Sequence, residues 1–201
     1  PWDLDKLDNE LPKANGHQFA DDPEFVNGTI ADKRVRIAGI GNIGSRYASV
    51  ASFLGADVEA YDPYADEPCF HRSSVGRVHS LDELVRDADI FVPTVALTEA
   101  TRGLVTKEHV DALPEGCLVV LITRAEVCDM EAIRRRVLAD EIMLAADVYD
   151  KEPLPLDDPL LDRRNVVHTP HIAGRTTDAN RRWAEHLDRH FSSVPAESQQ
   201  S

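Results

Sequence analysis

The chain has 201 residues, 42% of them hydrophobic, and its 36 acidic and 22 basic side chains give a formal net charge of −14. This charge disfavours binding to nucleic acid and to anionic membranes, and no apolar stretch is long enough to span a bilayer. The three cysteines are widely spaced, and the chain begins with neither a signal-peptide pattern nor an initiator Met. These features predict an acidic globular protein of the cytoplasm with free thiols and no metal site, and the missing Met suggests that something precedes the chain.

Residues 1–30 are repeatedly interrupted by Pro and Gly, and we expect them to form a lead-in segment. From residue 34, apolar runs typical of strands alternate with segments of helical period. The expected strands are Val35–Ile40, Val58–Tyr61, Ile90–Val95, Leu118–Ile122, Ile142–Val148 and Val166–His168. The expected helices lie near 43–54, 81–87, 107–113, 130–140 and 176–191.

This alternation predicts βαβ units and therefore a doubly wound α/β domain with a parallel sheet, over residues 31–193. The last three apolar runs show little polar alternation, which predicts strands that are buried on both faces. A polar tail, residues 194–201, is expected to be disordered.

The first strand leads into a G-x-G-x-x-G pattern formed by Gly39, Gly41 and Gly44, and a helix follows it. In a dinucleotide-binding turn the first glycine allows the tight turn, the second lets the backbone approach a pyrophosphate, and the third allows close packing of helix on strand. The amides at the start of the helix then face the negative charge. Because glycine-rich turns are widespread, the strand and helix around this one give it most of its weight.

Asp62 ends the second expected strand, about twenty positions after the second glycine, where an acidic residue accepts hydrogen bonds from the adenosine ribose. The alternative is an ordinary turn followed by a solvated carboxylate. A carboxylate repels a 2′-phosphate, and neither Pro63 nor Tyr64 supplies a guanidinium. Arg72 is the nearest basic residue downstream. The pattern therefore favours NAD over NADP.

Polar residues that follow the later strands are candidates for chemistry, because ligands bind at the carboxyl ends of such strands. The guanidinium group of Arg124 can bind a carboxylate through two hydrogen bonds. The imidazole of His171 is suited to proton transfer near neutral pH. Asp147 and Glu152 are nearby carboxylates. Each residue alone is more often structural, and their common position at strand ends is what favours a site.

Several segments together resemble one known family. They are 38–44, 61–64, 80–84, 97–104, 146–155 and 169–174. In this order they resemble the NAD-binding domain of the D-isomer-specific 2-hydroxyacid dehydrogenases, and the likeness covers roughly residues 30–190.

The resemblance implies a catalytic set of Arg124, Glu152 and His171. Arg124 would orient and polarise the substrate, His171 would be the general acid and base, and Glu152 would hold the imidazole. The implied cofactor is NAD, and the implied substrate is a small 2-hydroxy or 2-keto acid. The implied cofactor-binding residues are Gly39, Gly41, Asn42, Ile43, Gly44, Asp62, Val95, Thr101, Thr123, Asp147 and Ala173. The resemblance also implies a homodimer.

The chain departs from the family pattern at two motifs and in length. Thr94-Val95-Ala96 stands where the family usually has His-x-Pro, and Ala125-Glu126 stands where it usually has glycine after the arginine. Family members are about two domains long, so the chain is expected to be an isolated cofactor domain, with residues 1–30 as a remnant of the substrate domain.

Two other functions remain open. A non-catalytic NAD(H)-binding sensor or scaffold would share the glycine turn and Asp62, but it would not need the complete set of Arg124, Glu152 and His171. A reductase of another dinucleotide-binding family would require a different explanation for residues 169–174.

Overall fold

The computed structural model describes residues 29–161 and 163–192. The chain divides into two units, residues 1–30 and 31–201. The predicted tail and nearly all of the predicted lead-in lie outside the described residues, so the fold described below is that of the second unit.

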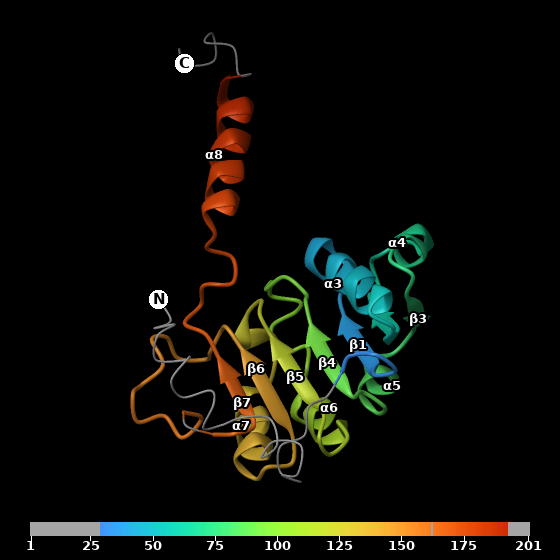
Figure 1. The fold of residues 1–201 in the computed structure, drawn as a ribbon, viewed down its shortest axis with the longest axis vertical. Helices are drawn as coiled ribbons and strands as arrows, with labels where there is room; N and C mark the ends of the chain where they lie inside the picture. The colour runs from blue at the N-terminus through green and yellow to red at the C-terminus, as the bar shows by residue number, and fades with distance from the viewer. Residues whose placement is uncertain (1–28, 162, 193–201) are drawn as a thin grey trace, which may run out of the picture. The chain divides into compact units, whose positions relative to one another are not determined.

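Seven strands form one parallel sheet, which confirms the predicted doubly wound α/β fold (Figure 1). The strands are β1 (Arg34–Ala38), β2 (Asp57–Tyr61), β3 (Gly76–Val78), β4 (Ile90–Pro93), β5 (Leu118–Leu121), β6 (Met143–Ala146) and β7 (Val166–His168). They lie in the order β3-β2-β1-β4-β5-β6-β7. The order reverses between β1 and β4, and a ligand binds at such a switch point, outside the carboxyl ends of the strands.

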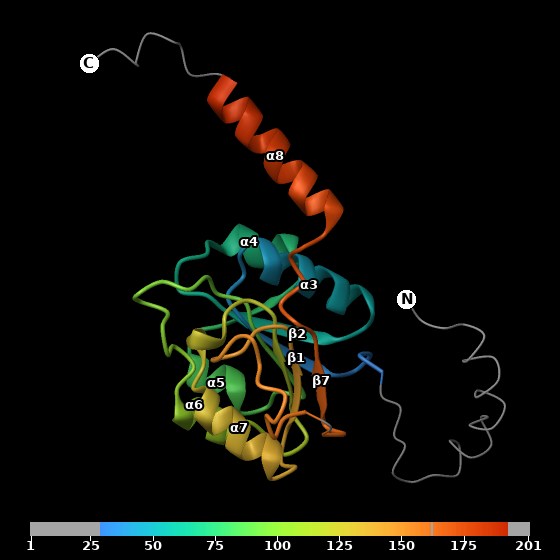
Figure 2. The ribbon, with the colours of Figure 1, turned by 90° about the vertical axis from the view of Figure 1, so that its left-hand side faces the viewer.

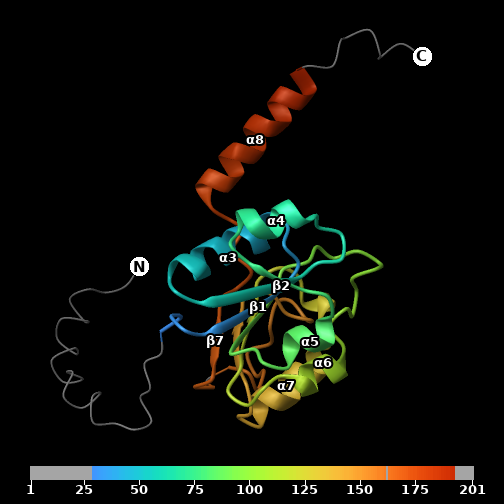
Figure 3. The same ribbon diagram turned by 90° about the vertical axis from the view of Figure 1, so that its right-hand side faces the viewer.

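Helices lie on both faces of the sheet, except α8, which projects away from it (Figures 1 to 3). The helices are α3 (Asn42–Phe53), α4 (Glu67–Arg72), α5 (Leu81–Val85), α6 (Lys107–Ala112), α7 (Met130–Leu138) and α8 (Thr177–Ser192), with a short 3₁₀ turn at Ala125–Val127. Figures 2 and 3 show α3 and α4 on one face and α5, α6 and α7 on the other. None of the helices in the described part of the chain is long and apolar enough to cross a membrane.

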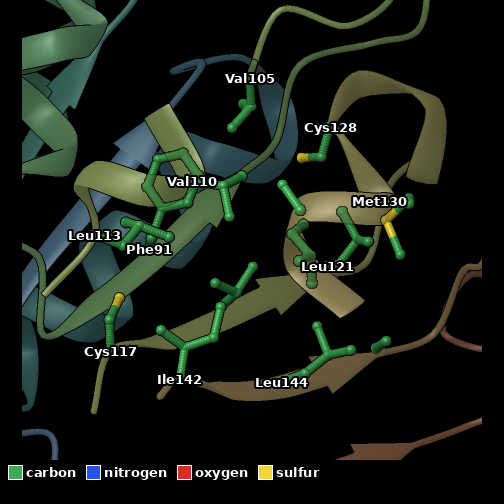
Figure 4. Close-up of a cluster of buried hydrophobic side chains, with 14 of the residues drawn as sticks. Phe91, Val105, Val110, Leu113, Cys117, Leu121, Cys128, Met130, Ile142 and Leu144 are labelled. Atoms are coloured by element: carbon green, nitrogen blue, oxygen red, sulfur yellow. The ribbon is translucent and has the colours of Figure 1, made fainter. Parts of the chain in front are cut away.

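A continuous apolar core fills the space between the sheet and helices α5 to α7 (Figure 4). Phe91 on β4, Leu121 on β5 and Leu144 on β6 are at most 1% exposed. Cys117 and Cys128 belong to the same core as free thiols, and burial raises the pKa of each to about 12. These thiols therefore act as small apolar side chains at neutral pH.

The structure corrects the sequence prediction in two places. The prediction that the last strands are buried on both faces is wrong for β6 and β7, because Met143 is 41% and Val167 is 69% exposed. The edge strand β3 and the helix α4 before it were not predicted. Helix α4 has a proline at its start and Phe70 as its one buried residue, and β3 begins at a glycine, so neither presents a period that can be recognised from sequence.

Candidate functional site

The glycine turn lies at the switch point between β1 and β4. Gly39 follows β1 with φ of +97°, a conformation that strains other residues, and a Cβ there would lie 2.8 Å from Val95 Cγ1. Its N–H donates to the carbonyl of Tyr61 at 2.8 Å. The hydroxyl of Thr94 donates to the Gly39 carbonyl at 2.7 Å. The turn is therefore held by the strands on both sides of β1.

The other two glycines have opposite surroundings. Gly41 caps α3 without a side-chain hydrogen bond, and a Cβ there would meet nothing within 4 Å. At Gly44 a Cβ would lie 2.0 Å from the Gly39 carbonyl oxygen and 2.7 Å from Thr94 Oγ1. Gly41 thus leaves ligand space open and exposes the first amides of α3, whereas Gly44 allows the helix to pack on the turn.

This contrast predicts different effects for two single-methyl substitutions. Gly44→Ala is expected to lower the free energy of unfolding by about 1–3 kcal/mol because its methyl group overlaps buried backbone. Gly41→Ala is expected to leave stability nearly unchanged and to weaken NADH binding at least about tenfold, because its methyl group occupies the ligand side of the turn. Urea unfolding and an NADH fluorescence titration of both variants check this. Equal losses of stability would contradict the assignment.

Asp62 lies at the end of β2 and binds the turn directly. Its Oδ2 accepts a hydrogen bond from the Ile40 amide at 3.0 Å, and Oδ1 accepts from the amides of Tyr64 and Ala65 at 2.9 and 3.2 Å. The carboxylate is thereby oriented at the rim of a groove of about 510 Å³ that Gly39, Gly41, Tyr64 and Val95 also line. Asp62 therefore has a structural function in addition to the predicted contact with ribose.

Thr101 lies across the same groove. Its hydroxyl donates to the Ala96 carbonyl at 2.6 Å, and the Thr98 amide donates to it at 2.8 Å. The side chain therefore fixes the loop after β4, and this loop forms one wall of the groove.

A larger cleft of about 900 Å³ continues from the groove toward the carboxyl ends of β5 and β6. The two share Gly41, Thr94, Val95 and Ala96 as lining residues. The cleft is also lined by Asn42, Ile43, Leu97, Ile122, Thr123, Arg124, Asp147, His171, Gly174 and Arg175. Every predicted cofactor-binding residue lines either the groove or the cleft, with two exceptions. Gly44 packs the helix on the turn, and Ala173 lines neither space.

Asp147 is 3% exposed and follows β6. Its Oδ1 accepts hydrogen bonds from the Thr169 hydroxyl at 2.5 Å and the Ile172 amide at 2.9 Å, and its Oδ2 accepts from the Ala173 amide at 2.9 Å. Burial alone would raise the pKa of Asp147, but these three donors lower it below its ordinary value. Asp147 thus fastens the loop that carries His171.

His171 is held in an uncommon conformation at the mouth of the cleft. Its φ is +52°, which is rare for a residue with a side chain and marks a position fixed by its surroundings. Nδ1 lies 2.7 Å from Glu152 Oε2, while Glu152 Oε1 accepts the Tyr149 amide at 3.0 Å. The hydrogen bond with His171 is the main cause that lowers the pKa of Glu152. The carboxylate therefore stays ionised and holds the imidazole through Nδ1, while Nε2 has no hydrogen-bond partner among the described residues.

Arg124 follows β5 and lies at the same end of the cleft. One of its guanidinium nitrogens donates to the Thr123 carbonyl at 2.7 Å, and the Thr123 hydroxyl donates to the Pro93 carbonyl at 3.2 Å. Arg124 lines a pocket of about 280 Å³ with Glu152 and His171. Among the described residues no carboxylate forms an ion pair with Arg124, so its fork is available to an anionic ligand.

The family model that describes the "D-isomer specific 2-hydroxyacid dehydrogenase, NAD binding domain" matches residues 4–173. The chain belongs to this family.

Relatives of the chain within the dehydrogenase family include two curated proteins. A D-3-phosphoglycerate dehydrogenase of Archaeoglobus fulgidus is 33% identical over 78% of this chain and 30% of its own length. A hydroxypyruvate reductase of Thermotoga maritima is 34% identical over 75% of this chain and 49% of its own length. The chain thus spans between about a third and a half of the length of these curated relatives.

A solved structure of D-lactate dehydrogenase from Aquifex aeolicus, complexed with NAD and lactic acid, superposes with a TM-score of 0.77. It is 25% identical and covers 94% of this chain and 60% of the solved chain. Three features of this chain fit the dinucleotide that the family binds. They are the open space at Gly41, the uncapped amides at the start of α3 and the carboxylate of Asp62 in the groove.

Two residues of this site were not identified from the sequence. The hydroxyl of Thr94 holds the Gly39 carbonyl, although the motif around Thr94 was noted only as a departure from the family. Arg175 lines the large cleft, and its closeness to His171 in sequence was the one signal that could have indicated it.

Proposed function

We propose that this chain is the cofactor-binding part of an oxidoreductase that transfers a hydride between NAD(H) and a D-2-hydroxy acid/2-keto acid pair. The proposal rests mainly on the 2.7 Å contact between His171 and Glu152, at the mouth of a cleft that also holds Arg124 and the glycine turn. A proton-transfer group, an anion-binding fork and a dinucleotide cleft are the three elements that this reaction requires.

Each protein group has a separate task in this reaction. Arg124 binds the substrate carboxylate and orients the carbonyl, because its planar guanidinium group can donate two parallel hydrogen bonds to a carboxylate. Nε2 of His171 takes the hydroxyl proton in oxidation and returns it in reduction, while Glu152 holds the ring through Nδ1. The bound cofactor would supply the redox chemistry, with NAD⁺ as hydride acceptor in oxidation and NADH as hydride donor in reduction.

The test of this function is a turnover assay on the natural polypeptide that contains these residues. NADH oxidation is followed by nicotinamide absorbance with unbranched, branched and hydroxylated 2-keto acids. Reduction of at least one keto acid to the D product supports the proposal. NADH binding without turnover of any of them would favour the alternative, a non-catalytic NAD(H)-binding sensor or scaffold.

The proposed preference for NAD over NADP depends on Asp62, which lines the groove. A carboxylate repels the 2′-phosphate of NADP. Asp62→Ala is expected to weaken NADH binding by about 1–2 kcal/mol through lost hydrogen bonds to a charged group. Because Asp62 also binds the amides of the turn, thermal unfolding must be measured in parallel. Unchanged NADH affinity in a folded variant would exclude the ribose contact.

Further properties of the whole protein are proposed on the same basis. We propose a homodimer of the cytoplasm that acts on a small acid and binds neither nucleic acid nor membrane. The net charge of −14 supports the last two points, because like charges repel phosphate and anionic lipid.

A further inference from the structure

Arg175 is a cation of the large cleft to which the proposed reaction assigns no task. It lies in the loop between His171 and α8, and its amide donates to the Ile172 carbonyl at 2.9 Å. The residue is exposed, and within the described part of the chain no carboxylate pairs with its guanidinium. A long side chain that faces a cleft with an unpaired charge is available to an anionic ligand.

The other lining of the cleft indicates which anion fits. Asn42 and Ile43 bring the uncapped amides at the start of α3 to the same cleft. Such amides bind a phosphate group, but they carry only partial charges. The charged side chains of this cleft are Arg124, Asp147 and Arg175, apart from His171. Arg124 lies beside the His171–Glu152 pair, and both oxygens of Asp147 already accept hydrogen bonds from the His171 loop.

We infer that Arg175 is a further cofactor-binding residue, which binds the pyrophosphate of the dinucleotide together with the amides of Asn42 and Ile43. A guanidinium supplies a full charge and two parallel donors to phosphate oxygens, which offsets the repulsion of a dianion by a protein with a net charge of −14. The inference rests on the proposed function, because it requires a dinucleotide in the cleft.

The assignment has a consequence for the loop that carries His171. This loop is fastened at its base by Asp147, through the amides of Ile172 and Ala173. A phosphate bound by Arg175 would fasten the other end of the same loop. Cofactor binding would therefore hold the segment that presents the imidazole at both of its ends, before any substrate arrives.

The test compares Arg175→Gln with Arg182→Gln in the 201-residue chain. Arg182 is an exposed residue of α8 outside the cleft, so its variant removes the same charge elsewhere. The ligands are NADH, ADP-ribose, which has the pyrophosphate, and adenosine, which lacks it. Arg175→Gln is expected to weaken NADH and ADP-ribose about tenfold and to leave adenosine unchanged, whereas Arg182→Gln changes none of them. Arg175→Lys should recover part of the affinity.

The outcomes separate this inference from the proposed function. If the natural chain binds NADH and Arg175→Gln binds it equally well, the inference is overturned and the cofactor site stands. Equal weakening by both variants would show a long-range effect of net charge and would also overturn it. If Arg175→Gln changes only the response to an added 2-keto acid, the guanidinium serves the substrate instead. A natural chain that binds neither NADH nor ADP-ribose would contradict both proposals.

Discussion

Replacing His171 with alanine is expected to lower kcat by about 10²–10⁴-fold, the range that general acid–base catalysis contributes. The variant removes Nε2, the proposed proton carrier, and leaves the glycine turn and Asp62 untouched. NADH affinity should therefore change by no more than about twofold. Steady-state kinetics and an NADH titration of the natural polypeptide that contains these residues check both numbers.

His168 provides a matched control for this substitution. It ends β7 and is exposed, and it contributes to an apolar pocket that also involves Glu152 and His171 but not to the cofactor cleft. His168→Ala should keep nearly normal kcat. If His171→Ala retains substantial activity, or if His168→Ala loses as much, His171 is not the acid–base group.

Asp147→Asn is expected to have the second largest effect, although the variant differs by one atom. In the asparagine side chain an NH2 group replaces one carboxylate oxygen, so a donor faces an N–H or O–H group of the loop. At least one part-buried donor of the loop then lacks its acceptor, at a cost of about 1 kcal/mol of stability or more. Release of the loop also displaces His171, and a shift of about 1 Å can cost about a hundredfold in kcat. The check is urea unfolding together with steady-state kinetics.

Thr169→Val is the control for Asp147→Asn. It removes only the hydroxyl that donates to Oδ1 and leaves the amides of Ile172 and Ala173 in place. Its loss of stability and of kcat should be clearly smaller. An Asp147→Asn variant with natural stability and kcat would show that this carboxylate does not hold the loop.

The pKa of Asp147 gives these losses a pH dependence. Because the three donors lower the pKa in the folded protein, the carboxylate contributes stability above the ordinary pKa of about 4, and this contribution is lost as pH falls through the lower folded value. The natural chain should therefore lose stability steeply in this acidic range. Asp147→Asn should lack that part of the acid transition, since asparagine does not titrate.

The fold was predictable from sequence wherever apolar residues recurred in a recognisable pattern. Strands β1, β2 and β4 to β7 and helices α3 and α5 to α8 were found within a few residues of their bounds, whereas β3 and α4 were not found. Near the exposed face of β6 and β7, apolar residues such as Met143 and Val167 suggested burial that the structure does not show. Composition alone does not reveal whether another element covers a strand.

The candidate site was predictable where its polar side chains lie directly after the carboxyl ends of predicted strands. Arg124, Glu152 and His171 were identified from their position, and the structure brings them to one pocket, although their catalytic roles stay predictions. The hydrogen bonds of Asp147 could not be predicted, because they join segments that are distant in the chain. Arg175 was overlooked because a single arginine in a loop has no pattern.

The site is assembled from two halves of the sheet. The turn after β1, Asp62 after β2 and the loop after β4 surround the groove, whereas Arg124, Asp147 and His171 follow β5, β6 and β7. The proposed acid–base pair and the glycine turn therefore come from different strands. A gene copy that lost His171 and Glu152 is expected to keep the turn and Asp62, and with them the binding of a dinucleotide. Such a copy would match the alternative function, a non-catalytic NAD(H)-binding sensor or scaffold.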